Sequence, residues 1–308
     1  MPELRRIVTA LAAALLCAPA SIHAQGAAPL PQRVASVGGF QLPESAQYDA
    51  ARDVYLVGNI NGHPTTKDGN GYVSRLRPDG TVESLGFIRG GRGGVVLHAP
   101  KGLLVVGDTL WVADIDAVRG FHLTSGAPLR SIDLSGVGAV FLNDLARGPD
   151  GALYVTDTGL RFGPTGPPTH PGPDRVFRVA PDGTVSTALE GTNLAAPNGI
   201  FWDEAGGRFL IGSLWGKTVL AWKPGEAAAQ VAAEGAGGFD GISRLPDGRV
   251  VVASQDAEAV QVLDGTGLTT LFGGLSSPAD IGVDTRRNRV LVPLVGEDRV
   301  EIWQLPEG

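Results

Sequence analysis

After its first residues, the chain alternates short apolar runs with turns rich in Gly, Pro, Asp and Asn. Typical runs are Leu153-Tyr154-Val155, which follows Asp150-Gly151, and Arg249-Val250-Val251-Val252, which follows Asp247-Gly248. Runs of β-branched and aromatic residues bounded in this way predict short strands. The one candidate helix is an Ala-rich stretch from Gly225 to Glu234, and it lacks capping residues. The pattern therefore predicts an all-β protein.

Six segments of similar pattern recur along the chain, and a strand, a turn and a second strand follow each of them. The segments are Pro43-Glu44-Ser45-Ala46, Pro100-Lys101-Gly102-Leu103, Leu142-Asn143-Asp144-Leu145, Pro197-Asn198-Gly199-Ile200, Phe239-Asp240-Gly241-Ile242 and Pro278-Ala279-Asp280-Ile281. Their starts are 57, 42, 55, 42 and 39 residues apart. A four-stranded propeller blade has about 40 to 50 residues. The repeat therefore predicts a six-bladed β-propeller with blades of about four antiparallel strands.

The two ends of the repeat array are expected to meet. A strand at Arg33 to Val37 would lie beside Arg299 to Trp303 in the last blade, because this pairing removes exposed strand edges. Each repeat needs its neighbours to bury its faces, so we expect a single propeller domain at residues 33–308. A short linker at residues 25–32 would precede it.

Residues 1–24 have the pattern of a secretory signal peptide. Arg5-Arg6 precede an apolar run from Ile7 to about Ala18, and Ile22-His23-Ala24 resembles a cleavage site. The run is too short to span about 30 Å of hydrocarbon. Cys17, the only cysteine, lies within it, so the mature chain would have no disulfide and no thiolate metal site. We expect an exported protein, periplasmic or secreted.

The charge balance limits the partners. The chain has 25 Lys and Arg against 32 Asp and Glu, a formal net charge of -7. This balance disfavours nucleic acids and anionic membranes, and it suits a cation or a small molecule. The chain also lacks the Gly-x-Ser-x-Gly and His-Glu-x-x-His motifs, which argues against a serine hydrolase and a zincin. The oligomeric state is left open by the sequence.

The second residue of each segment is expected near the start of an innermost strand, at one mouth of the central channel. These residues are Glu44, Lys101, Asn143, Asn198, Asp240 and Ala279. Turn formation explains Asn and Asp before Gly, but it does not explain Glu44. Two carboxylates and two carboxamides offer only oxygen ligands, which suit a hard divalent cation such as Ca²⁺ or Mg²⁺.

The same positions carry a family resemblance that covers almost the whole mature chain. It lies in Leu142-Asn143-Asp144-Leu145 followed by Asp150 to Asp157, in Pro197-Asn198-Gly199-Ile200, and in Asp240-Gly241-Ile242 followed by Pro246-Asp247-Gly248. By these motifs the chain resembles the senescence marker protein, gluconolactonase and luciferin-regenerating enzyme superfamily of six-bladed propellers. The resemblance implies that Glu44, Asn198 and Asp240 hold one divalent metal ion. Ca²⁺ is the first expectation, and Mg²⁺, Mn²⁺ or Zn²⁺ are compatible. Asn143 would be a further ligand or would orient the substrate.

The resemblance also implies a reaction. A metal-polarised lactone or related ester would be opened by water, and Asp240 would accept the proton while Asn143 orients the substrate. Asp240 could equally serve only as a ligand. Two other classes remain open: a propeller that binds a ligand or a protein without catalysis, and a metal-dependent lyase or condensing enzyme.

Four further residues are candidates for substrate binding. Phe141 stands where sugar-lactone members of the superfamily have a substrate-contacting arginine, which argues against a polyhydroxy sugar acid. Lys101 would bind an anionic group of the substrate or, as we favour, pair with Glu44 or Asp240. Asp144 would contact the substrate or bind backbone amides. His170 lies in the second of two long loops, at residues 61–71 and 159–175, which are either lids over the mouth or surface excursions.

Two further sets of residues are expected to be structural. The second strands of the first five blades end in polar residues, and Leu294 breaks the pattern in the sixth. These residues are Asn59, Asp114, Asp157, Ser213 and Ser254. Binding to turn backbones is favoured over a role as an inner layer around the mouth. The tryptophans are expected to fill space between the sheets. They are Trp111, Trp202, Trp215, Trp222 and Trp303.

Overall fold

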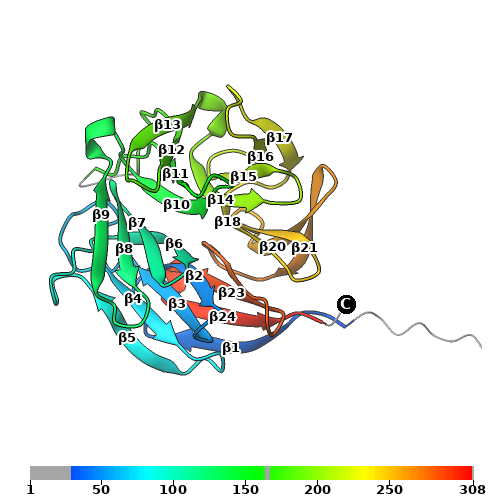
Figure 1. Ribbon diagram of the computed structural model, residues 1–308. Coiled ribbons are helices and arrows are strands. Elements are labelled where there is room, and N and C mark those ends of the chain that lie inside the picture. The colour runs from blue at the N-terminus through cyan, green and yellow to red at the C-terminus, as the bar shows by residue number, and fades with distance from the viewer. Residues whose placement is uncertain (1–28, 164–166, 307–308) are drawn as a thin grey trace, which may run out of the picture.

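The computed structural model describes residues 29–163 and 167–306, and six four-stranded antiparallel sheets lie around a common axis (Figure 1). This arrangement confirms the predicted six-bladed β-propeller. The expected signal peptide at residues 1–24 lies outside the described residues. In the described part of the chain, no helix has the length and hydrophobicity needed to cross a bilayer.

Blades 1 to 3 each use four consecutive strands, numbered from the axis outward. Blade 1 comprises β2 (Pro43–Asp49), β3 (Val54–Asn59), β4 (Tyr72–Leu76) and β5 (Val82–Arg89). Blade 2 comprises β6 (Pro100–Val106), β7 (Thr109–Asp114), β8 (Ala117–His122) and β9 (Pro128–Asp133). Blade 3 comprises β10 (Leu142–Arg147), β11 (Leu153–Asp157), β12 (Arg175–Val179) and β13 (Val185–Glu190).

Blades 4 and 5 repeat this order, and blade 6 borrows its outermost strand from the N-terminal side. Blade 4 comprises β14 (Pro197–Asp203), β15 (Arg208–Ser213), β16 (Thr218–Trp222) and β17 (Gln230–Glu234). Blade 5 comprises β18 (Phe239–Arg244), β19 (Val250–Ser254), β20 (Ala259–Asp264) and β21 (Gly267–Gly273). Blade 6 comprises β22 (Gly282–Asp284), β23 (Arg289–Leu294), β24 (Arg299–Gln304) and β1 (Gln32–Gly38).

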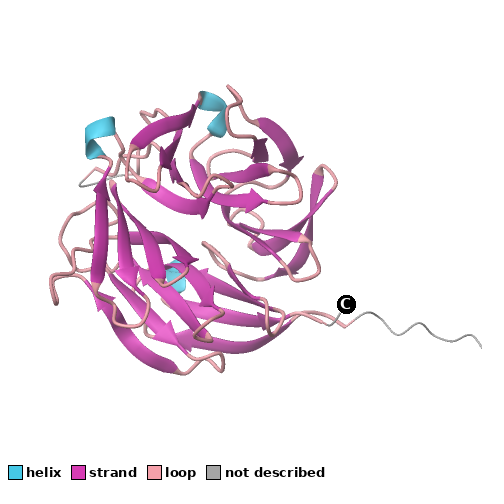
Figure 2. Ribbon diagram, in the orientation of Figure 1, coloured by secondary structure: helices cyan, strands magenta, loops and turns pink. Residues whose placement is uncertain are grey.

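Helical structure in the described residues is limited to three short 3₁₀ turns between strands (Figure 2). They are η1 (Ser135–Val137), η2 (Thr192–Leu194) and η3 (Val295–Glu297). The Ala-rich stretch from Gly225 to Glu234 ends in strand β17, because pairing with β16 satisfies its backbone groups in a way that an isolated helix of this length could not match.

Strand β1 closes the ring as predicted. It pairs antiparallel with β24, with Arg33 opposite Trp303 and Val37 opposite Val300. The guanidinium of Arg33 also contacts the carboxylate of the buried Glu301, with Nη1 and Oε1 2.7 Å apart. The pairing covers the edge that β24 would otherwise expose.

The core lies between neighbouring blades. Six separate clusters of buried apolar side chains each join two adjacent blades. Between blades 3 and 4, Phe209 lies 4.5 Å from Tyr154 and 5.8 Å from Trp222 by ring centroids. Between blades 5 and 6, Trp303 stacks on Phe272 at 4.4 Å. Each blade is therefore held by both neighbours, and the axis carries the polar side chains.

Candidate metal and substrate site

Strand registers show that the six segments are equivalent. The first residue of each segment faces the last residue of the second strand of its blade. These pairs are Pro43–Asn59, Pro100–Asp114, Leu142–Asp157, Pro197–Ser213, Phe239–Ser254 and Pro278–Leu294. In the first five blades a register shift follows directly. Such bulges redirect side chains, so the second residue of each segment can turn toward the axis at one common mouth.

Three of these second residues have a buried oxygen atom without a hydrogen-bond partner. They are Oε2 of Glu44, Oδ1 of Asn198 and Oδ1 of Asp240, from blades 1, 4 and 5. Their side chains are 7%, 2% and 3% exposed. Native proteins rarely leave such oxygens unsatisfied, because each costs about 1–3 kcal/mol. Three at equivalent positions around one axis fit a common cation.

The opposite oxygen of Asp240 is satisfied. Gln255, in the turn after β19, donates from Nε2 to Oδ2 of Asp240 over 2.9 Å. This bond orients the carboxylate and leaves Oδ1 directed elsewhere. Gln255 was not among the residues predicted from the sequence. Its place directly after Ser254, at the end of a second strand, was the only available signal.

Four buried carboxyl groups influence one another in the channel. Burial raises the pKa of Asp144 to about 7, and burial together with the charge of Asp144 raises the pKa of Asp240 to about 7. Burial and the charge of Asp240 raise the pKa of Glu44 well above its ordinary value. Burial and the charge of Asp144 do the same for the pKa of Asp280. Among the described residues, Lys101 is the cation that opposes the shift in the pKa of Glu44, so these four carboxyl groups outnumber the basic groups that influence them.

Lys101 does not form the favoured ion pair with Glu44 or Asp240. The ion pairs found within residues 29–163 and 167–306 do not include it. Its Nζ lies 4.2 Å from the ring centroid of Phe141 and donates to the carbonyls of Pro64 and Ala99 over 3.3 Å each. Burial lowers the pKa of Lys101 to about 8, although the charge of Glu44 opposes this shift.

The two long loops meet over Lys101. His63, from the first loop, and Phe162, from the second, lie edge to face at 5.9 Å, and Phe162 lies 5.2 Å from Phe141. Pro64 of the first loop also accepts the bond from Lys101. Phe141, predicted to bind substrate, is therefore buried beneath both loops at the mouth.

Asn143 and Asp144 follow one another in β10 but have different surroundings. Asn143 is 4% exposed and is not among the residues with an orphaned oxygen. Asp144 accepts from the backbone N–H of Leu145 over 2.7 Å and of Ile200, in the next blade, over 2.8 Å. These contacts support the structural interpretation of Asp144.

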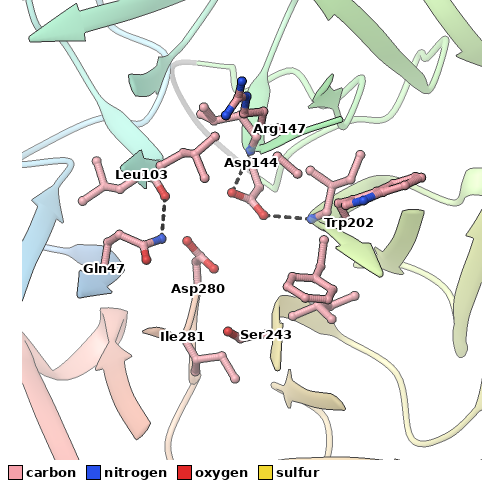
Figure 3. A pocket seen from close by; sticks show the side chains of 14 residues that line it. Gln47, Leu103, Asp144, Arg147, Trp202, Ser243, Asp280 and Ile281 are labelled. Carbon is pink, nitrogen blue, oxygen red and sulfur yellow. Dashed lines mark hydrogen bonds between the residues drawn. The ribbon is translucent and has the colours of Figure 1, made fainter. Parts of the chain in front are cut away.

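A cavity of about 320 Å³ lies on the channel wall beyond the ring of second residues (Figure 3). Asp144 and Asp280 line it, together with residues further along the inner strands such as Gln47 and Ser243. Asp280 accepts a hydrogen bond from Ser45 of the neighbouring blade. Asp280 and Ser45 were part of the repeat segments but were not selected from the sequence, because their pairing joins the first and last blades.

The polar residues that end the second strands bind loop backbone, as favoured. Asp114 accepts from the N–H of His98 and Ala99, and Asp157 accepts from the N–H of Val140 and Phe141. Each loop so held leads directly into an inner strand. These residues therefore stabilise the entry of the chain into the ring.

His170 lies apart from the ring, in the second loop. Its Nε2 is 2.6 Å from Oδ1 of the buried Asp174, and its ring lies 5.0 Å from that of Trp215. The prediction that the tryptophans fill space between sheets is wrong for Trp215, which is 51% exposed. Trp215 lies in a turn at the mouth, where no neighbouring sheet covers it.

The donor set fits a hard divalent cation. The orphaned oxygens of Glu44, Asn198 and Asp240 are carboxylate and carboxamide oxygens, which are ligands that Ca²⁺ prefers. No group of three His, Cys, Asp or Glu side chains with metal-binding geometry occurs in the described part of the chain. Among the six second residues, the oxygen donors are two carboxylates, Glu44 and Asp240, and two carboxamides, Asn143 and Asn198.

Comparisons with known proteins agree with the fold. The family model of the SMP-30/gluconolactonase/LRE-like region matches residues 42–279. No curated protein sequence matches the chain. Among solved structures, a gluconolactonase from Xanthomonas campestris has a TM-score of 0.65 at 18% identity and covers 90% of this chain and 89% of its own.

Two other solved structures with different activities share this fold. A luciferin-regenerating enzyme has a TM-score of 0.63 at 12% identity, covering 91% of this chain and 95% of that chain. A streptogramin B lyase has a TM-score of 0.59 at 13% identity, covering 89% of this chain and 97% of that chain. The fold is thus compatible with more than one reaction.

Proposed function

Because the chain belongs to the SMP-30/gluconolactonase/LRE-like family, we propose that it is a metal-dependent hydrolase that opens a lactone or a related ester. The orphaned oxygens of Glu44, Asn198 and Asp240 carry this proposal. The gluconolactonase from Xanthomonas campestris, which shares the fold, gives it further support.

Each residue of the ring has a proposed part. Glu44, Asn198 and Asp240 hold the cation through their orphaned oxygens, and Ca²⁺ is the preferred ion. A bound cation polarises the substrate carbonyl and stabilises negative charge on its oxygen. Asn143 orients the substrate from the same mouth. Asp240 accepts the proton of the attacking water at Oδ2, which Gln255 holds in place.

The surroundings of the ring would control access. Phe141 and Phe162 form an apolar wall, and the loop that contains His63 closes over Lys101. Such a cover excludes bulk water and strengthens electrostatic interactions inside the site.

Turnover measured after chelation tests the proposal. The purified protein is treated with a chelator and assayed on a panel of lactones and aryl esters, with and without Ca²⁺, Mg²⁺, Mn²⁺ or Zn²⁺. We expect Ca²⁺ to restore hydrolysis, and Glu44→Gln and Asp240→Asn to lower kcat/KM by roughly 100-fold or more. Asp247→Asn, in an exposed turn, is the control that should behave as the wild type.

The outcomes separate the alternatives. Hydrolysis that survives both chelation and Asp240→Asn would contradict the proposal. Metal binding without turnover of any panel member would favour a lyase or a binding protein, both of which the fold allows.

We also propose that the protein is exported to the periplasm or secreted, on the basis of the apolar run after Arg5-Arg6. N-terminal sequencing of the protein recovered from the periplasm or the medium tests this, and a mature start at Gln25 is expected. Recovery only from the cytoplasm with an intact N-terminus would contradict export.

A further inference from the structure

A second cavity lies beside the ring of second residues, not within it. It has a volume of about 670 Å³ and lies between the loop that follows β11 and the turn that follows β15. The loop after β11 starts at a strand end that pairs with Leu142, and the turn after β15 starts at a strand end that pairs with Pro197. Leu142 and Pro197 are the first residues of their repeat segments. The cavity therefore opens on the same face of the propeller as the proposed metal site.

Trp215 forms an exposed aromatic wall of this cavity. Its side chain is 51% exposed, although an indole buries a large apolar surface when it is covered. Its backbone is held, because the N–H of Trp215 donates to the carbonyl of Ala195 over 3.1 Å. Pro171 and Pro173 supply further rigid apolar surface. An exposed indole on a held backbone offers a face on which a flat ring can stack.

His170 and Asp174 form the adjoining wall. The bond between Nε2 of His170 and Oδ1 of Asp174 holds the imidazole edge to face against Trp215, at an interplanar angle of 71°. Asp174 is 4% exposed and also accepts from the N–H of Ala196 over 3.0 Å at Oδ2. Both oxygens of Asp174 are thus engaged, and the geometry of this wall does not depend on a ligand.

The cavity shares a chain segment with the proposed metal site. Ala195 lines the cavity, and Ala195 and Ala196 have φ angles of 51° and 60°, a conformation that costs a non-glycine residue about 1–2 kcal/mol. Asp174 and the turn of Trp215 hold this strained segment. Asn198 follows two residues later. A ligand in the cavity would therefore lie against the segment that presents a metal ligand.

We propose that this cavity is a substrate subsite that binds an uncharged aromatic ring attached to the lactone or ester, a role that rests on the proposed hydrolase function. A cavity of this size accommodates one such ring with room for its substituents. The carboxylates of Asp174 and Glu190 at its wall disfavour an anionic group. Stacking on Trp215 would provide most of the binding energy.

Binding and turnover test the subsite separately. Isothermal calorimetry measures the binding of 4-hydroxyphenylacetamide, a non-hydrolysable aromatic probe, with gluconamide as the non-aromatic probe. We expect saturable binding of the aromatic probe alone. Trp215→Ala should weaken this binding roughly 10-fold, and Trp215→Phe should largely preserve it. Trp202→Phe, a change in the cavity of Figure 3, should leave it unchanged.

The kinetic arm compares γ-butyrolactone with its γ-phenyl derivative. In Trp215→Ala, KM for the phenyl derivative should rise roughly 10-fold with little change in kcat, because the lost contact stabilises ground state and transition state alike. KM for the unsubstituted lactone should stay the same.

Failure of the subsite and failure of the hydrolase proposal give different results. Probe binding that Trp215→Ala weakens, without turnover of any lactone, would retain the subsite and overturn the hydrolase. Metal-dependent turnover with equal effects of Trp215→Ala on both lactones, or no binding of the aromatic probe, would overturn the subsite.

Discussion

The buried carboxylate of Asp240, which has one orphaned oxygen, should destabilise the metal-free protein. In the fold its pKa is about 7, against an ordinary value of 3.8. Each unit of this difference corresponds to 1.36 kcal/mol, so the ionised group costs the folded state roughly 4 kcal/mol at pH 8. At pH 5 the folded protein keeps the group neutral while the unfolded chain ionises it. The cost then falls to roughly 1–2 kcal/mol.

The variant Asp240→Asn removes this charge with little change in shape. The new carboxamide can still accept the bond from Gln255, but it leaves a buried N–H group unsatisfied, which costs about 1–2 kcal/mol. In chelator at pH 8, the variant should therefore be more stable than the wild type by about 2 kcal/mol. Near pH 5 the gain should disappear.

Calcium should reverse the order of stability. An ion at 100 times its dissociation constant stabilises the wild type by about 2.7 kcal/mol, and a variant that cannot bind it gains nothing. Urea unfolding followed by tryptophan fluorescence, at both pH values and with chelator or Ca²⁺, gives the four comparisons.

A satisfied buried carboxylate provides the matched control. Asp284 is fully buried like Asp240, but Tyr55 donates to its Oδ2 over 2.6 Å and Arg287 over 3.0 Å. Asp284→Asn should lower stability in chelator at pH 8 and keep the wild-type response to Ca²⁺. The reasoning is refuted if Asp240→Asn also loses stability in chelator at pH 8, or if Ca²⁺ stabilises it as much as the wild type.

Three further predictions concern the proposed metal ligands and the closure of the propeller by β1. Calcium binding near pH 6 should release about one proton per ion, and fewer as the pH rises, because Asp240, with a pKa of about 7, holds a proton in the metal-free fold; calorimetry in buffers of different ionisation enthalpy measures this. Asn143→Ala should keep calcium affinity within about twofold, while its kcat/KM falls roughly 100-fold. Asn198→Ala should lose both calcium affinity and activity. Calcium titration and turnover assays measure the two effects. Deleting β1 (Gln32–Gly38) should lower the melting temperature by about 10 °C or more, while deleting only the residues before it should not; differential scanning calorimetry compares the two.

The sequence repeat allowed both the propeller architecture and the ring of second residues to be predicted. Once six segments are equivalent, positions such as Glu44 and Asp240 must lie at the same depth of the channel, although nearly 200 residues separate them. The strand registers confirm this equivalence. The pairing of β1 with β24 was predictable for a related reason, since an open propeller would expose two strand edges.

Contacts between side chains of different blades could not be predicted from the repeat. Lys101 has carboxylates within electrostatic range, but it packs on Phe141, because the bulge and the first loop place an aromatic ring and two carbonyls around its ammonium group. Trp215 resembles the other tryptophans by composition and spacing. Only its position in a turn at the mouth, which depends on the length of the loop after β15, distinguishes it.

The closure of the propeller also explains why the sixth blade departs from the pattern of the repeat segments. Its inner strand β22 begins only at Gly282, and its second segment residue is Ala279, which offers no ligand. The backbone of Asp280 there bonds to blade 1, donating to the carbonyl of Glu44 over 2.9 Å and accepting from the N–H of Ala46 over 3.0 Å. These two bonds flank Ser45 and fix the backbone of Glu44. The sixth blade therefore contributes backbone contacts rather than a proposed metal ligand, and the position of Glu44 depends on the junction between the first and last blades.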